Sequence, residues 1–201
     1  MIKYLLKLKK AFPFLWVLIE NANGVLFRFI YYKKILRCSK VILKDYSHEK
    51  FTYRFLLNSD LIALTLLFQR QSAEQFKYFK PHPFDYGTLR RLYNNPSFLM
   101  FGVFNDDVLV GYFFLRCFVN KKSFTGRFVD SAYQGHGISR RMGKILHQIA
   151  WNSKFRVFGT ASRDNIKSIN SYQSINNFKV IKELDNNFIF FEYLKSEEKP
   201  L

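Results

Sequence analysis

The chain has 201 residues, of which 48% are hydrophobic, and a formal net charge of +17. This length suits one domain with room for an appendage, and the apolar content excludes a disordered chain. Cys38 and Cys117 form no Cys-x-x-Cys or Cys/His cluster, so we expect no disulfide framework, no metal site, and reduced thiols in a cytoplasmic protein. The cationic excess predicts an anionic partner, which charge alone does not identify.

The first 50 residues differ from the rest, and we expect residues 1–50 to form a basic amphipathic extension ahead of a domain at 51–201. Residues 1–44 hold ten Lys/Arg and one acid, Glu20. Their longest uninterrupted apolar run, 14–19, is too short to cross a bilayer, which takes about 20 residues. Lys3, Lys7 and Lys10 share one predicted helix face, and aromatic residues lie between two basic clusters.

This pattern is typical of a helix at the headgroup layer of an anionic membrane, which predicts a peripheral contact through residues 1–44 at the inner face of the membrane. A helix that packs on the domain with a solvated basic face explains the same residues, and both interpretations stay open.

From residue 51 the pattern alternates between strands and helices. Apolar and aromatic runs between turn residues predict strands at 51–57, 98–104, 108–119, 123–129, 155–161, 180–184 and 188–193. Helices are predicted at 60–69, with Ser59 or Asp60 as N-cap and 74–79 as a continuation, and at 85–93, 138–150 and 165–176. This order predicts a mixed α/β sheet.

A glycine-rich loop joins the strand 123–129 to the helix that follows it. Gly135, Gly137 and Gly143 lie within nine residues, and Arg140 falls in the first helical turn. Glycines let backbone N–H groups face a ligand, and the helix N-terminus adds the positive end of its dipole. The loop therefore suits a pyrophosphate, although it matches neither the dinucleotide nor the P-loop pattern.

These residues resemble the GNAT family of N-acetyltransferases over about residues 51–193. The family's acyl-CoA signature, Gln/Arg-x-x-Gly-x-Gly/Ala, corresponds to Gln134–Ser139, with Ser139 in place of the last small residue. A second signature, Asn-x-x-Ala/Ser-x-x-x-Tyr, corresponds to Asn165, Ser168 and Tyr172, which share one helix face. The resemblance implies a mixed, mainly antiparallel central sheet with flanking helices.

The resemblance also implies the chemistry, which is direct aminolysis of the acetyl-CoA thioester by an amine. It assigns Tyr172 as the general acid that protonates the leaving thiolate. It assigns cofactor binding to Phe128, Val129, Gln134, Gly135, His136, Gly137, Ile138, Ser139, Arg140, Asn165 and Ser168. The general base is left open among Asp130, Glu74, His82, Asp85 and a water relay.

The acceptor is expected to be a small amine held by the aromatic segment at 76–86. An amino sugar on a nucleotide or lipid carrier, as used in surface polysaccharides, is our specific hypothesis, and an amino acid, a polyamine or a protein amine stay open. The alternative class is a non-catalytic basic module on the same fold that binds a membrane or nucleic acid. Nucleic acid is disfavoured because the cations beyond residue 44 are scattered and no RNA-recognition signature is present.

Overall fold

The computed structural model of the protein describes residues 13–46 and 50–195. One seven-stranded sheet has the order β1-β2-β3-β4-β5-β7-β6 and is antiparallel except at the β4–β5 pair. The strands are β1 (Thr52–Phe55), β2 (Phe98–Asn105), β3 (Val108–Cys117), β4 (Lys122–Val129), β5 (Arg156–Ser162), β6 (Phe178–Leu184) and β7 (Phe188–Tyr193).

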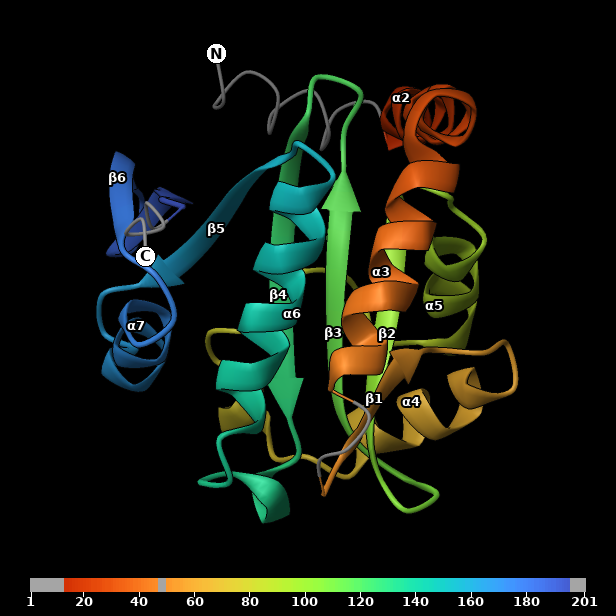
Figure 1. Cartoon of the computed structure of the whole chain (residues 1–201). Helices are drawn as coiled ribbons and strands as arrows, with labels where there is room; N and C mark the ends of the chain where they lie inside the picture. Colours follow the sequence, from red (N-terminus) through yellow and green to blue (C-terminus); the bar gives the residue numbers. More distant parts are fainter. Residues whose placement is uncertain (1–12, 47–49, 196–201) are drawn as a thin grey trace.

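The helices cover both faces of the sheet (Figure 1). They are α2 (Pro13–Phe27), α3 (Lys33–Asp45), α4 (Asp60–Gln69), α5 (Tyr86–Tyr93), α6 (Ile138–Asn152) and α7 (Ile166–Gln173). One buried cluster joins α3 and α6 to the sheet, and a second joins α4 and α5 to its other face. The predicted mixed sheet with flanking helices is thus confirmed.

The predicted elements agree with the structure except in one short segment. Residues 74–79 do not continue α4, because that helix ends at Gln69 and a separate 3-10 turn, η2 (Ala73–Phe76), follows. At the start of α4, Ser59 makes no capping hydrogen bond. Asp60 fixes this end instead, since its carboxylate accepts from the Leu57 amide at 2.7 Å and pairs with Arg54.

The sheet opens between β4 and β5, which is the feature that creates the groove described below. Their parallel pairing is limited to Lys122–Phe124 against Arg156–Phe158. Past these residues the two strands diverge (Figure 1), and along 125–129 β4 pairs with β3. One long edge of β4 therefore faces open space rather than another strand.

The N-terminal helices form one bent run. A π-helical turn, η1 (Arg28–Tyr32), joins α2 to α3 with helical backbone on both sides, and Figure 1 shows α2 nearly end-on above α3. Bends of this kind are common at π-turns. The predicted face of Lys3, Lys7 and Lys10 lies outside the described residues.

The described part of this run shares the core of the sheet. Its buried members Phe27, Ile35, Ile42 and Leu43 belong to the same apolar cluster as Phe113 of β3 and Ile145 of α6. The division of the chain at residue 50 stays a prediction, and the shared core favours a single unit.

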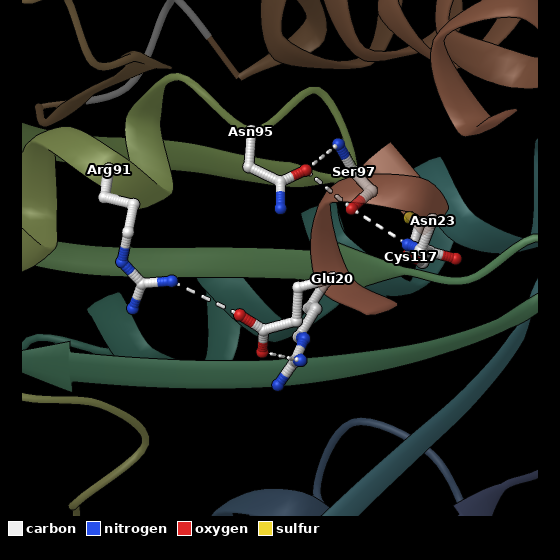
Figure 2. A network of polar contacts seen from close by, with 7 residues as sticks. Glu20, Asn23, Arg91, Asn95, Ser97 and Cys117 are labelled. Carbon is white, nitrogen blue, oxygen red and sulfur yellow. Dashed lines mark hydrogen bonds and ion pairs between the residues drawn. The ribbon is translucent and has the colours of Figure 1, made fainter. Parts of the chain in front are cut away.

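A polar network ties α2 to the far end of β3 (Figure 2). Glu20 pairs with Arg116 of β3 at 2.5 Å and with Arg91 of α5 at 3.3 Å. The Asn23 amide nitrogen donates to the Cys117 carbonyl, and its oxygen accepts from the Val119 amide. These contacts join residues more than 70 positions apart, so α2 is held in one orientation.

Candidate functional site

A groove of about 840 Å³ lies where β4 and β5 diverge. The loop 134–137 and the first turn of α6 form one wall, the C-terminal end of β5 with α7 forms the other, and the segment 74–79 closes one end. The open edge of β4 runs along it. An extended ligand in this groove can hydrogen-bond to unpaired backbone, as an added strand does.

The glycine loop has the conformation that an anion site requires. Gly135 and Gly137 have φ values of +84° and +74°, a region that residues with a side chain avoid. Gly137 is the N-cap of α6, and Gly135 has open space where a Cβ would lie. The free N–H groups and the positive end of the α6 dipole therefore face the groove together with Arg140.

Across the groove, α7 presents Tyr172. Asn165 caps the helix by accepting from the Ser168 amide at 3.1 Å, which fixes its first turn. Tyr172 is half-buried, and its ring packs against Phe191 of β7 with centroids 5.6 Å apart. Its ring is therefore held in place while the residue lines the groove.

Comparisons with known proteins bear on the fold. No family model matches the sequence, and no curated protein matches it. Solved structures do match. The GNAT domain of S. lividans PAT aligns with a TM-score of 0.62 and 13% identity, over 70% of this chain and 88% of that one.

Two ligand-bound structures show the same likeness. A putative acetyltransferase from Salmonella typhimurium, yncA, solved with its cofactor acetyl-CoA, aligns with a TM-score of 0.59 and 18% identity, over 75% of this chain and 96% of that one. A spermidine N-acetyltransferase from Vibrio cholerae, in complex with CoA and spermine, aligns with a TM-score of 0.58 and 16% identity, over 71% and 92%. The chain has the GNAT fold.

Within this GNAT fold, nearly all the predicted site residues line one groove. They are Phe128, Val129, Gln134, Gly135, Gly137, Ile138, Ser139, Arg140, Asn165, Ser168 and Tyr172. His136 is the exception. Its Nδ1 lies 3.0 Å from the Gln134 carbonyl oxygen and its ring packs against Phe51, so its side chain braces the loop outside the groove.

Sequence reasoning missed Arg127, which connects the two walls of the groove. Its guanidinium donates from Nη1 to the Ser139 carbonyl at 2.8 Å and lies 4.7 Å from the centre of the Tyr172 ring. Gly143 makes room for it, because a Cβ there would lie 2.1 Å from Nη1. The Nη2 group is buried and has no partner among the described residues. The only signal in the sequence was an arginine in an otherwise apolar and small strand.

The four candidate bases occupy different surroundings. Burial opposes the charge of Asp130, but hydrogen bonds from the Ala132 amide and the Arg70 side chain outweigh it, so its pKa lies below the ordinary value. An ion-paired aspartate is a weak base. The Asp85 carboxylate already serves as the N-cap of α5, where it accepts a hydrogen bond from the Thr88 amide at 2.8 Å.

His82 lies away from the groove in an aromatic cluster. Its Nδ1 lies 2.7 Å from the Pro83 carbonyl oxygen, which makes Nδ1–H the donor and leaves Nε2 to accept from the Tyr112 hydroxyl at 3.1 Å. Burial lowers its pKa. Of the four candidates, only Glu74 lines the groove, where it is exposed.

Proposed function

We propose that the protein is an acetyl-CoA-dependent N-acetyltransferase that transfers an acetyl group to a small amine. The observation that carries this proposal is the groove between β4 and β5, which combines an open strand edge, a left-handed glycine loop at a helix N-terminus, and Tyr172 on the opposite wall. Each feature suits one part of an acyl-CoA. The open strand edge suits the extended arm, the glycine loop suits the pyrophosphate, and Tyr172 suits the thiolate that leaves.

The residues of the groove fit such a cofactor. The amides around Gly135, Gly137 and Ser139, with Arg140, suit the pyrophosphate. The backbone edge at Phe128 and Val129 suits the extended arm. When bound, acetyl-CoA supplies an activated acetyl thioester. The buried Nη2 of Arg127 is an unused donor beneath this path, and its cation keeps the floor of the groove positive.

The chain's own groups then have distinct tasks. Tyr172 holds a proton on its hydroxyl for the departing sulfur, and the packing of its ring against Phe191 fixes the direction of that hydroxyl. The Val129 amide, at the end of β4, polarises the carbonyl that becomes an oxyanion. Glu74 is the base that the groove favours, acting directly or through water on the incoming ammonium.

The acceptor enters from the end of the groove near 74–79. Of the aromatic residues expected to hold it, Tyr78 and Phe79 line the groove. Phe76 and Phe84 are not among the groove's lining residues, and their rings contact one another with centroids 5.0 Å apart. An aromatic edge beside a carboxylate suits a polar amine, and we keep an amino sugar as the specific candidate.

Two measurements test this function. Isothermal titration should give saturable acetyl-CoA binding that Arg140→Gln weakens and Lys144→Gln, an exposed cation one turn later, leaves unchanged. A thiol-release assay across amino sugars, amino acids, polyamines and peptide amines should then identify the acceptor class.

The two assays separate the possible failures. Absence of cofactor binding at about millimolar concentration, which is the upper range of typical KM values, would refute the proposal. Binding without thiol release on every amine class would leave a non-catalytic acyl-CoA-binding module.

A further inference from the structure

The outward side of α2 and η1 carries an apolar surface that the function above does not use. Seven large hydrophobic residues there are between 42% and 83% exposed: Leu15, Leu18, Ile19, Val25, Leu26, Phe29 and Ile30. Intervals of three, four and seven residues relate these positions, which places them on one side of the helix. This outer stripe is about 24 Å long at helical rise. An amphipathic helix normally turns such a stripe toward the core, so its exposure requires an explanation.

The opposite side of α2 makes specific contacts with the rest of the protein, and these contacts fix the orientation of the helix. Phe27 is buried in the core of the sheet. Glu20 and Asn23 also face the sheet, through their polar network (Figure 2). Gly24 lets the helix approach so closely that a Cβ would lie 2.7 Å from Asn95 Oδ1. A helix fixed by specific polar contacts does not rotate its apolar side inward, and the stripe is therefore a permanent surface of the described chain.

The charges around the stripe are of one sign. Glu20, the single acid in residues 1–44, is turned inward onto Arg116. Exposed cations flank the stripe or follow it along η1 and α3: Arg28, Lys33, Lys34, Arg37 and Lys40. The surface thus combines an apolar helix side with a cationic border and no exposed acid between positions 15 and 44 of the described chain.

We infer that the outer stripe docks on the headgroup layer of an anionic membrane. In this position the stripe enters the boundary between headgroups and acyl chains, while Lys33 and Lys34, at the start of α3, face lipid phosphates. Charge complementarity favours this occupant over a second copy of the chain, because pairing two stripes would bring two sets of cations together without an opposing acid. No described helix is both long and apolar enough to cross the bilayer.

Docking in this way leaves the groove free. The α2 helix contacts Cys117 and Val119, next to the beginning of β4, whereas the groove lies at the end of that strand. Eight strand residues span about 25 Å, and Figure 1 shows α2 and the start of α6 at opposite ends of the sheet. The membrane therefore localises the protein without covering the site, which argues against a requirement for a lipid-linked acceptor.

Vesicle sedimentation of the full chain tests the inference. The protein should sediment with phosphatidylglycerol-containing vesicles and not with pure phosphatidylcholine, and binding should decline from about 0.05 M to about 0.5 M salt as the charges are screened. Val25→Ser with Phe29→Ser should weaken binding roughly tenfold or more. The matched control replaces Ile62 and Leu66, two hydrophobic residues that are more than half exposed on α4, with serine and should bind like the wild type.

Charge variants provide a second arm. Lys33→Gln with Lys34→Gln should weaken binding to the anionic vesicles several-fold. Lys179→Gln with Lys182→Gln, which removes two exposed lysines from β6, should not. Thermal unfolding of each variant shows whether the fold is intact, and substitutions at exposed positions should leave it unchanged.

Several results would overturn the inference. They are wild-type sedimentation with neither vesicle, equal sedimentation with both, or unchanged binding of the Val25/Phe29 variant. A dimer of the lipid-free protein in analytical ultracentrifugation that this same variant dissociates would assign the stripe to a second copy instead.

Discussion

Phe27 and Phe29 offer a paired test of whether the N-terminal helix belongs to the core. The side chains are two positions apart on one helix and have opposite surroundings, since Phe27 is 0% exposed and Phe29 is 83% exposed. The Phe27 ring meets the rings of Tyr31 and Phe155 at centroid distances of 5.9 and 6.0 Å. Phe155 directly precedes β5, so this contact joins α2 to the second half of the sheet.

Replacing Phe27 with alanine should lower the free energy of unfolding by about 3–5 kcal/mol, the range for a buried Phe whose cavity does not collapse. Phe29→Ala should change it by less than about 0.5 kcal/mol. In urea, with a slope of about 2–3 kcal/mol per molar, the midpoint should fall by about 1–2.5 M for Phe27→Ala alone. Far-UV circular dichroism follows the transition.

Equal, small effects of the two substitutions would refute the reasoning. That result would mean that α2 contributes nothing to global stability and that residues 1–50 are an independent extension. A truncated chain that begins at Asp45 provides a second test. Its loss of Phe27, Ile35 and Ile42 from a shared core should prevent cooperative unfolding.

Three further changes test the groove and the core. Tyr172→Phe should lower single-turnover acetyl transfer by about 10²-fold or more and leave acetyl-CoA affinity unchanged; full activity would assign the proton to another group. Gly137→Ala should cost about 1–2 kcal/mol of stability and weaken cofactor binding, because its φ is +74°, whereas Gly87→Ala, in a helix with ordinary φ, should not. Burial lowers the pKa of His147 from 6.5 to about 4. Its neutral form therefore stabilises the fold fully above pH 6.5, and up to about 3 kcal/mol is lost as pH falls toward about 4. In His147→Leu, the free energy of unfolding measured in urea should fall less between pH 6.5 and about 4 than in the wild type. The same fall in both proteins would mean that other groups cause the pH dependence.

The strands and helices from residue 51 could be predicted from the sequence because local patterns determine them. Continuous apolar and aromatic runs, buried on both faces of the sheet, identify β2 and β3, and turn residues mark their ends. The loop at Gln134–Ser139 was readable for a similar reason, since its glycines are needed by the backbone itself. The site followed from two motifs placed on either side of one strand.

Contacts between distant residues were not readable. Asn23 appeared only as an interruption of an apolar run, yet it bonds to the backbone at Cys117 and Val119. Arg127 appeared as one more cation, although its position depends on the absence of a side chain at Gly143. The inward turn of Glu20 depends on Arg116, 96 residues later. Periodicity gives the faces of a helix but does not say which of two apolar faces is buried.

The narrow junction between β4 and β5 has a consequence for local stability. Three residue pairs connect these strands, whereas β2, β3 and β4 are joined by seven or eight pairs each, so the backbone pairing that holds β5, β6 and β7 to the rest of the sheet is short. Its amides should exchange with solvent through partial opening, ahead of global unfolding. A molecule seated across the groove would bridge both halves and bind only the closed form. Hydrogen exchange of β5 and β7 would then slow in proportion to ligand occupancy, which reports binding even where no turnover occurs.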